Sequence, residues 1–452
     1  MIEDKKNIVI AGAGLVGAMW ACYMAKRGHH VRVFERRGDM RGQEVDAGRS
    51  INLALSTRGW NALAKIGMKE ALEKIAIPMK GRMIHQEDGA TNFQAYGKEG
   101  QAIYSISRRD LNIALMNKAD ESKNVTFTFH ERTTDLDLKK NIIHFQNEKT
   151  GSESTVSPDL LFGADGAFSA VRSTLQKINM FNYSQQYLEH GYKELTIPAD
   201  ENSKHRLDKN ALHIWPRKSF MLIALPNLDG SFTVTLFLKF KGVDGFDDLN
   251  TEDKITSFFT KNFPSAIKHM PDLIKEFHEN PSSSLVTVRC SPWHYKNVCL
   301  MGDSAHAIVP FYGQGMNAAF EDCFVLDEII DRHVLDDWSS VLEEYTRDHA
   351  KDGAAIAELA LRNFIEMRDA TADDKFLLRK KLELHLMNTF PGRYLSQYQM
   401  VTFSNIPYST ALSKGDTQTA FAEHLIDEFP EPSSWTNPVF IDKVDDWLSQ
   451  TH

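Results

Sequence analysis

The stretch NIVIAGAGLVG, residues 7–17, decides the fold of this chain. It joins an apolar strand to three glycines at the spacing G-x-G-x-x-G. Residues 18–27 then place apolar side chains at helical spacing, and a second apolar strand, 30–34, ends at Glu35. A strand, a glycine turn, a helix and a strand that ends in an acid form the dinucleotide-binding unit of doubly wound α/β proteins. The sequence therefore predicts a Rossmann-like domain at the start of the chain.

Each glycine of this turn has its own expected role. Gly12 permits the tight turn, Gly14 lets a pyrophosphate approach bare backbone, and Gly17 lets the helix lie close to the strand. The helix N-terminus offers free N–H groups and the positive end of its dipole. The Glu35 carboxylate can accept hydrogen bonds from both ribose hydroxyls.

The bulk composition is that of a large globular protein. The 452 residues suffice for two or three packed lobes, with 42% hydrophobic and 25% charged residues. The net charge of -9 argues against nucleic acid as a partner. The four cysteines show no CxxC spacing, so we expect a reducing compartment, no disulfides and no metal site.

No segment predicts secretion or membrane insertion. Residues 1–6 precede no long apolar segment, and the longest apolar stretch, 220–226, is too short to cross a bilayer. Residues 444–450 offer no anchor either. We therefore expect a cytoplasmic protein with no membrane partner.

Alternating α/β sequence is interrupted by a β-rich insertion and followed by a helical tail. Strand patterns at 211–215, 220–225 and 231–240 mark the insertion, and 338–387 is almost continuously helical. We expect an α/β fold with a Rossmann-like domain, an inserted β-rich substrate domain and a helical C-terminal region. The expected boundaries are 1–75, 101–178 and 285–335 for the Rossmann-like domain, 76–100 and 179–284 for the β-rich domain, and 336–452 for the C-terminal region.

Two later strands also end in an acid. Residues 160–166, LLFGADG, form a buried strand and a tight turn, which alone is compatible with an ordinary strand–turn–helix corner. Residues 301–306, MGDSAH, place Asp303 at a second strand end, and a glycine-rich turn, 313–317, opens a helix. Ligands of open α/β sheets bind at the carboxyl ends of strands, and a helix N-terminus favours negative charge on a ligand.

Together these three motifs resemble the signature of single-component FAD-dependent aromatic hydroxylases, which share the p-hydroxybenzoate hydroxylase fold. The resemblance implies bound FAD, with NADPH and O2 as transient co-substrates. No second nucleotide fingerprint follows, which disfavours flavin disulfide reductases and two-domain monooxygenases. The residues that the resemblance assigns to the cofactor are Gly12, Gly14, Leu15, Gly17, Glu35, Arg36, Leu55, Arg108, Asp165, Asp303, Gly315, Met316 and Asn317.

The resemblance also implies roles within this set. Asp303 would bind the ribityl chain, Arg108 would face the FAD, and Asp165 belongs to a motif that serves both FAD and NADPH. The helix that begins near Gly315 would point at the pyrimidine edge of the flavin, where reduction deposits negative charge.

Longer stretches are similar to the kynurenine 3-monooxygenase family. They are 48–55, 81–83, 210–216, 224–229, 231–238, 309–317 and 398–404. Members of this family hydroxylate L-kynurenine to 3-hydroxykynurenine in tryptophan degradation. The resemblance implies that O2 adds to the reduced flavin as a hydroperoxide, which the ring carbon ortho to the aniline nitrogen attacks. Because that nitrogen activates the ring, no catalytic general base is predicted.

The implied substrate has an amino-acid head and an aniline ring. Arg82 resembles the family's carboxylate-binding arginine, although by itself it would indicate a solvated strand end. A helical stripe from Ile356 starts apolar and ends polar, and periodicity alone leaves solvent and ligand as equal choices for that end. The residues that the family places at the substrate are Arg82, Tyr96, Asn363, Glu366, Met367 and Tyr398, with Leu212, Ile223, Phe237, Pro310 and Phe311 around the ring.

Other interpretations remain open from the sequence. A hydroxylase of another small aromatic acid is the alternative function, and a non-catalytic nucleotide-binding module is the alternative from another class. A flavin-dependent halogenase is disfavoured because its WxWxIP segment is absent. The missing hydrophobic C-terminal segment resembles soluble bacterial members of the family. The sequence leaves a homodimer open, and Tyr312 lies where family members differ.

Overall fold

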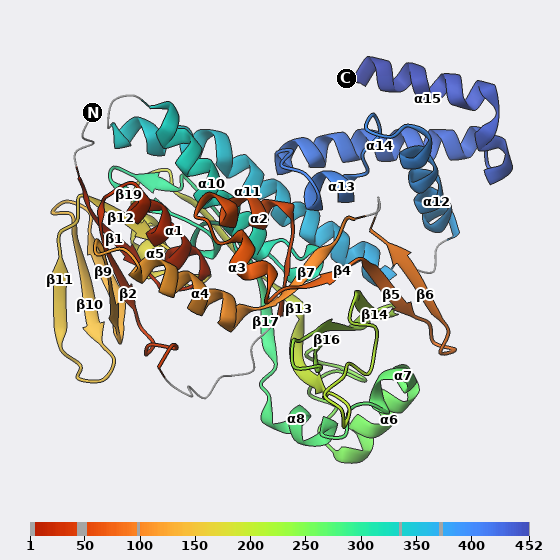
Figure 1. Cartoon of the computed structure of the whole chain (residues 1–452), viewed down its shortest axis with the longest axis horizontal. Coiled ribbons are helices and arrows are strands. Elements are labelled where there is room, and N and C mark those ends of the chain that lie inside the picture. The colour runs from red at the N-terminus through yellow and green to blue at the C-terminus, as the bar shows by residue number, and fades with distance from the viewer. Residues whose placement is uncertain (1–4, 43–51, 97–99, 334–336, 370–373, 452) are drawn as a thin grey trace.

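The computed structural model describes residues 5–42, 52–96, 100–333, 337–369 and 374–451 of the chain. In Figure 1 the six-stranded sheet lies at the left, the seven-stranded sheet below the centre, and the C-terminal helices at the upper right. Both sheets and the helices between them contribute to the site described below.

A parallel sheet forms the centre of the Rossmann-like part. Its strand order is β18-β19-β12-β1-β2-β8, and β18 alone among these six strands runs antiparallel to its neighbour. The strands are β1 (Asn7–Ala11), β2 (His30–Glu35), β8 (Val125–Phe129), β12 (Leu160–Gly163), β18 (His294–Tyr295) and β19 (Val298–Leu300). The chain crosses from β1 to β2 on one side, and β12 pairs on the other, so β1 and β12 flank a switch point where α/β sheets bind ligands. The predicted dinucleotide unit is confirmed.

Helices and two small sheets surround this centre. Helices α1 (Leu15–Lys26), α4 (Arg108–Asp120) and α10 (Gly315–Arg332) share its apolar core. The shorter helices are α2 (Thr57–Lys65), α3 (Lys69–Glu73), α5 (Ala170–Leu175), α9 (Asp303–His306) and the 3-10 turn η1 (Pro310–Tyr312). The small sheets are β3 (Asn52–Leu55) with β7 (Ile103–Ser107) and β4 (Ile77–Met79), and β11 (Glu153–Val156) with β10 (Ile142–Asn147) and β9 (Glu131–Asp137).

The second large sheet is assembled from distant segments. Its order is β17-β13-β16-β15-β14-β5-β6, and β5 pairs in parallel with β14. The strands are β5 (Gly81–His85), β6 (Thr91–Ala95), β13 (Asn182–Ile197), β14 (Ala211–Arg217), β15 (Phe220–Pro226), β16 (Phe232–Lys239) and β17 (Ser283–Ser291). The expected domain boundaries stay a prediction. Strand β17 includes residues of the 285–335 segment, which was expected in the Rossmann-like domain, and pairs with β13 in this sheet.

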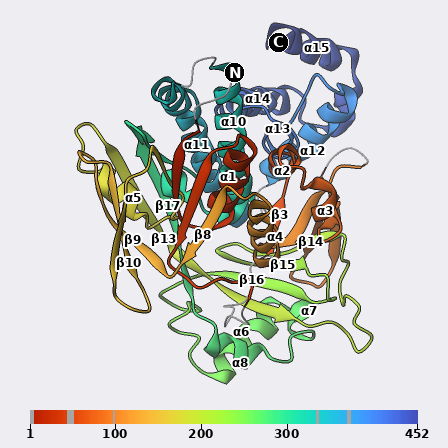
Figure 2. The ribbon, with the colours of Figure 1, turned by 60° about the vertical axis from the view of Figure 1, so that its left-hand side comes forward.

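The two faces of this sheet have different partners. One face, which includes Trp215, Leu222 and Val234, packs on α6 (Glu252–Asn262), α7 (Pro264–Ile267) and α8 (Leu273–Glu279) in a single apolar cluster. Figure 2 shows α6 and α8 beneath the sheet, with α10, α11 and α14 above it. The helices α6, α7 and α8 are absent from the sequence prediction, which treated 179–284 as β-rich. Their apolar side chains cover the sheet face that would otherwise be exposed to water.

The C-terminal region is helical, as predicted. Its elements are α11 (Trp338–Asp369), α12 (Asp374–Thr389), α13 (Gln397–Thr402), α14 (Tyr408–Glu428), the 3-10 turn η3 (Pro432–Thr436) and α15 (Pro438–Thr451). Parts of α12, α14 and α15 form a small apolar core of their own, while α11 reaches the clusters beside η1. Within the described part of the chain, no helix combines the length and the apolar character needed to cross a membrane.

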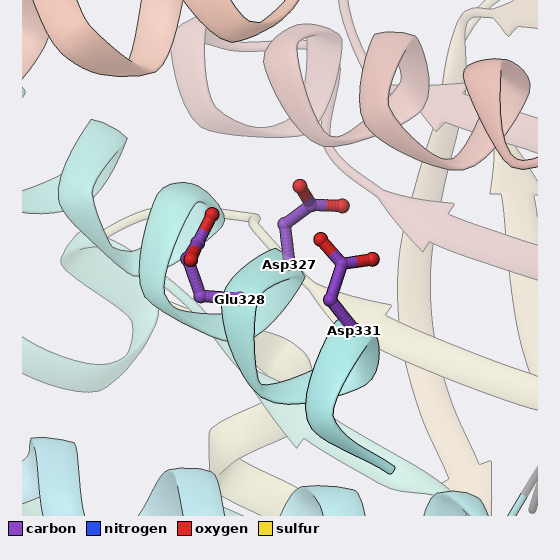
Figure 3. Close-up of side chains that lie close together, drawn as sticks. All are labelled: Asp327, Glu328 and Asp331. Atoms are coloured by element: carbon purple, nitrogen blue, oxygen red, sulfur yellow. The ribbon is translucent and has the colours of Figure 1, made fainter. Parts of the chain in front are cut away.

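Three carboxylates gather on α10, as Figure 3 shows for Asp327, Glu328 and Asp331. Arg27, the C-cap of α1, lies 2.7 Å from Asp327 and 2.6 Å from Asp331, and Lys65 of α2 pairs with Glu328. These two cations offset most of the charge of the three carboxylates, so the group fastens α10 to α1 and α2.

Candidate active site

The glycine turn has the shape that a pyrophosphate requires. A Cβ on Gly12, whose φ is +101°, would lie 2.4 Å from the Ala164 carbonyl, and one on Gly17 would lie 2.0 Å from the Gly12 carbonyl. A Cβ on Gly14 would meet nothing within 4 Å. Gly14 is the N-cap of α1 and no side chain caps it, so N–H groups face this open space beside the half-buried Leu15.

Glu35 is held beside this turn as a buried carboxylate. Its Oε2 accepts a hydrogen bond from the Ala13 N–H at 2.9 Å, and its Oε1 accepts from the Arg37 backbone and Nε at 3.0 and 2.9 Å. Burial opposes the charge, but Arg37 outweighs burial and lowers the pKa of Glu35. Arg37 occupies both lone pairs of Oε1, whereas Oε2 retains one for a ribose hydroxyl, and Arg36 is exposed next to this carboxylate. The turn and Glu35 therefore fit the adenosine half of FAD.

A second acid faces the same region from the end of β19. The Asp303 side chain is exposed, yet desolvation by the surrounding protein raises the pKa of its carboxyl group. The charge of Arg108 acts in the opposite direction. Arg108 is the first residue of α4 and is also exposed. An accessible carboxylate and an accessible guanidinium within electrostatic range of each other fit a polar cofactor chain that lies between them.

Asp165 holds the backbone of these motifs. Its Oδ2 accepts from Ala170 N at 2.7 Å, at the start of α5, and its Oδ1 accepts from the Ser304 hydroxyl at 3.1 Å. Ser304 in turn accepts from Gly166 N at 2.9 Å. Asp165 therefore joins the turn after β12 to the turn that carries Asp303.

The start of α10 offers backbone donors to a ligand. Its N-cap, Gln314, makes no capping hydrogen bond, and Gly315 and Met316 are half-buried. The Asn317 side chain is occupied by protein: its Oδ1 accepts from Ser56 N at 2.9 Å, and its Nδ2 donates to the Ala54 and Gly313 carbonyls. Asn317 therefore fixes the turn, next to the buried Leu55, and leaves the contact with a ligand to the helix N–H groups.

Four of the substrate candidates share the second face of the seven-stranded sheet. Arg82 pairs with Leu212 across β5 and β14, Ile214 pairs with Ile223, and Met221 pairs with Phe237. Since alternate residues of a strand point to one side, Arg82, Leu212, Ile223 and Phe237 lie on one face. This face is opposite to α6, α7 and α8.

Two tyrosines enclose the Arg82 guanidinium. Its Cζ lies 4.7 Å from the ring centre of Tyr398 and 5.6 Å from that of Tyr96, and the two rings stack at 5.6 Å. The Arg82 Nε and the Tyr96 hydroxyl are buried, and neither has a partner at good hydrogen-bond geometry among the described residues, although Arg82, Tyr96 and Tyr398 act on one another electrostatically. Burial raises the pKa of Tyr96 well above its usual range, so the phenol stays a donor. Unpaired buried donors are costly, and two that converge indicate a site for an anion.

Aromatic and polar residues of η1 and α11 cover the sheet face. Phe311 lies 5.0 Å from Phe237 and 4.3 Å from Phe364, measured between ring centres, and the Asn363 amide donates to the Phe311 carbonyl at 2.6 Å. Pro310 is the exposed first residue of η1. Asn363 therefore holds η1 in place.

Glu366, which the family resemblance places at the substrate, has a cationic neighbour. Glu366 lies 3.8 Å from Arg379 of α12. Tyr312 stacks on Tyr398 at 5.8 Å, and Arg82 and Glu366 both act on its phenol, whose pKa burial raises well above the usual range. The Met367 side chain lies outside the described residues.

Sequence reasoning missed a buried acid that supports the Asp303 turn. Asp322 of α10 accepts from Gly302 N at 2.7 Å, from His306 at 2.7 Å and from His349 at 3.0 Å. Burial disfavours the His349 cation, but hydrogen bonds to Asp322 and Asp352 outweigh burial and raise the pKa of His349 to about 10. A carboxylate on the buried side of an amphipathic helix was the available signal.

Comparison with known proteins gives a consistent result. A family profile described as "FAD binding domain" matches residues 5–360. The chain is 46% identical over 444 residues to kynurenine 3-monooxygenase of Flavobacterium johnsoniae, covering 98% of this chain and 99% of that protein. It is 46% identical over 426 residues to kynurenine 3-monooxygenase of Christiangramia forsetii, covering 94% and 95%. A tetrameric form of 2-methyl-3-hydroxypyridine-5-carboxylic acid oxygenase matches with a TM-score of 0.66 at 17% identity, covering 83% and 96%, and shows the shared fold.

Replacement of Gly14 by valine should separate cofactor binding from folding. The new side chain has room in the protein but would occupy the space expected for the pyrophosphate, so FAD affinity should fall by at least about tenfold. Flavin absorbance per protein and the thermal unfolding midpoint measure the two effects. Gly17→Val is the contrast, because its side chain meets the Gly12 carbonyl and should lower stability directly. A folded Gly14→Val protein with full flavin content would contradict this assignment.

The His349 pKa predicts a loss of stability in alkali. A pKa of about 10 in the folded protein, against 6.5 for an unperturbed histidine, stabilises the fold fully below pH 6.5. This contribution is lost as the pH rises from 6.5 through about 10. The thermal unfolding midpoint should therefore decline over this interval, and His349→Gln should be less stable at neutral pH with a shallower decline. Equal slopes for both proteins would contradict the ion pair.

Proposed function

This chain belongs to the kynurenine 3-monooxygenase family of FAD-binding monooxygenases, and from that premise we propose how its residues bind L-kynurenine. The reaction is the NADPH- and O2-dependent hydroxylation of L-kynurenine to 3-hydroxykynurenine in tryptophan degradation. The cofactor is FAD. The proposal concerns the residues at the substrate.

The substrate carboxylate binds at Arg82 between Tyr96 and Tyr398. The single observation that carries this is the pair of buried donors, Arg82 Nε and the Tyr96 hydroxyl, which have no partner at good hydrogen-bond geometry among the described residues. A carboxylate supplies the acceptors that both lack, and a guanidinium binds a carboxylate with matched geometry. The aromatic faces on Arg82 favour its charge and fix its orientation.

The aniline ring lies along the apolar sheet face. Leu212, Ile223 and Phe237 form the floor, and Phe311 covers it from η1. The ammonium group of the substrate is placed toward Glu366, where it competes with Arg379 for the carboxylate. A contact with Glu366 would make the site prefer an amino acid over a simple aromatic acid, because the latter has no ammonium group.

The residues of this chain orient the substrate and keep water away. The glycine turn, Glu35, Asp303 and the start of α10 would hold FAD, which when bound takes electrons from NADPH and activates O2. The amino group of the substrate already donates electron density to the carbon that is hydroxylated, so no side chain has to remove a phenolic proton. The apolar side chains around the ring exclude water from the reacting atoms, and the Arg82 clamp sets which carbon faces the flavin.

Removal of the guanidinium tests the site of the carboxylate. Arg82→Met should weaken kynurenine binding by about ten- to a hundredfold, because a charge-assisted hydrogen bond contributes about 1.5–3 kcal/mol. The FAD content should not change. Kynurenine affinity is measured by titration of the flavin absorbance under anaerobic conditions without NADPH.

Two further variants sharpen this test. Arg82→Lys keeps the charge but not the fork of donors, and should lie between the wild type and Arg82→Met. Arg132→Met changes an exposed arginine of β9 and should bind kynurenine as the wild type does. Wild-type affinity in Arg82→Met would remove Arg82 from the substrate site.

A further inference from the structure

A fully buried arginine, Arg58 of α2, is not explained by the reaction. The exposed fraction of its side chain is 0%. Its Nε donates to the Val401 carbonyl at 2.9 Å and its Nη2 to the Met400 carbonyl at 3.3 Å. Its Cζ lies 3.8 Å over the ring of Tyr408, and Glu321 of α10 pairs with its Nη1. Among the described residues, the hydrogen-bond, ion-pair and ring partners of this guanidinium lie on α10 or in the segment that contains α13 and the start of α14.

The carbonyls that accept hydrogen bonds from Arg58 belong to the last turn of α13, and α13 also contains the substrate candidate Tyr398. Met400 and Val401 lie in the last turn of α13, where unsatisfied carbonyls give the helix end a partial negative charge. One turn earlier, Tyr398 stacks with Arg82, and the Gln399 amide donates to the Tyr96 carbonyl at 2.6 Å. The position of α13 therefore decides the position of the Tyr398 ring.

Arg58 is also connected, through the residues that precede it in the chain, to the region where we propose that FAD binds. Ser56, which precedes α2, donates its N–H to Asn317 Oδ1 at 2.9 Å. Asn317 lies in the first turn of α10 and also binds the Gly313 carbonyl at 2.9 Å. Arg58 is thus rigidly connected, two residues along the chain, to the turn that faces the flavin in the proposed function.

We propose that Arg58 is a positioning residue for substrate binding, which holds Tyr398 of α13 against Arg82 from the flavin side of the molecule. This inference rests on the proposed function. Arg58 itself touches neither Arg82 nor the substrate, so it acts through the end of α13. A buried ion pair such as Arg58 with Glu321 adds little net stability but fixes geometry, since only one arrangement satisfies all of its donors.

The main test combines two substitutions in the full-length holoenzyme. Arg58→Met should weaken kynurenine binding by about tenfold while the FAD content stays at the wild-type level. Tyr398→Ala removes the ring through which Arg58 acts. In the Tyr398→Ala background, Arg58→Met should then change the kynurenine affinity by less than about twofold, because the two effects are coupled. Affinity is read from the flavin absorbance under anaerobic conditions.

A matched control separates this role from general stability. Lys193 is also a buried cation that binds carbonyls at a helix end, those of Phe277 and Asn280 at α8, but it lies on the other side of the sheet. Lys193→Met should lower the thermal unfolding midpoint and leave the kynurenine affinity unchanged. If Arg58→Met does not fold, Arg58→Lys, which keeps the charge but not the fork of donors, is measured in its place. Arg58→Lys should also weaken kynurenine binding, but by less than Arg58→Met.

The outcomes distinguish this inference from the proposed function. Unchanged affinity in the folded Arg58 variant, or fold-losses that multiply when Arg58 and Tyr398 are changed together, would overturn the positioning role. Loss of affinity in Lys193→Met to the same extent would also overturn it. If Arg82→Met binds kynurenine as the wild type does, the proposed substrate site fails instead, whatever the result at Arg58.

Discussion

Contact between backbone and backbone at the glycine turn is the constraint on which the rest of the structure depends. Gly17 brings α1 so close to the Gly12 carbonyl that no side chain fits between them, and this closeness aims the N–H groups of α1 at the end of β1. Glu35 binds the same turn through Ala13. The adjacent turns that carry Asp165 and Asp303 are joined through Ser304. Three stretches that are distant in the sequence thereby meet in one region, where we propose that FAD binds.

The site also depends on how the seven-stranded sheet divides its faces. Alternation along β14, β15 and β16 sends one set of side chains toward α6–α8 and the other toward α11. Arg82 enters the second set because β5 pairs in parallel with β14. A shift of one residue in that register would turn Arg82 toward the face covered by α6–α8. The pairing of these two strands therefore matters as much to the clamp as the arginine itself.

The sequence allowed prediction of those parts that are encoded locally. The βαβ unit at residues 7–35 is visible because the glycines, the apolar strands and Glu35 lie within one short segment. The α/β class and the helical C-terminal region follow from periodicity in the same way. The grouping of Arg82 with Tyr96 and Tyr398 came from a family resemblance, because nothing local to Arg82 distinguishes a clamp from a solvated strand end.

The parts that escaped prediction are those whose partners are chosen by tertiary structure. Arg58 sits in an ordinary helical sequence, and only the fold brings it to the carbonyls of α13. Asp322 likewise finds Gly302 and two histidines from separate helices. The helices α6–α8 were missed because they are short, at 11, 4 and 7 residues, and follow strand-rich sequence, so the sheet face that they cover was not visible beforehand.

The parallel pairing of β5 with β14 has a consequence for the order in which this protein becomes competent during synthesis. The ribosome releases β5 long before β14, and α13 emerges later than either strand. The glycine turn and Glu35 emerge before β14, the Asp303 turn and the start of α10 emerge after it, and the proposed carboxylate clamp closes only after α13 has emerged. The last part of the proposed flavin site, the start of α10, therefore emerges before α13, which completes the part that would select what the flavin oxidises.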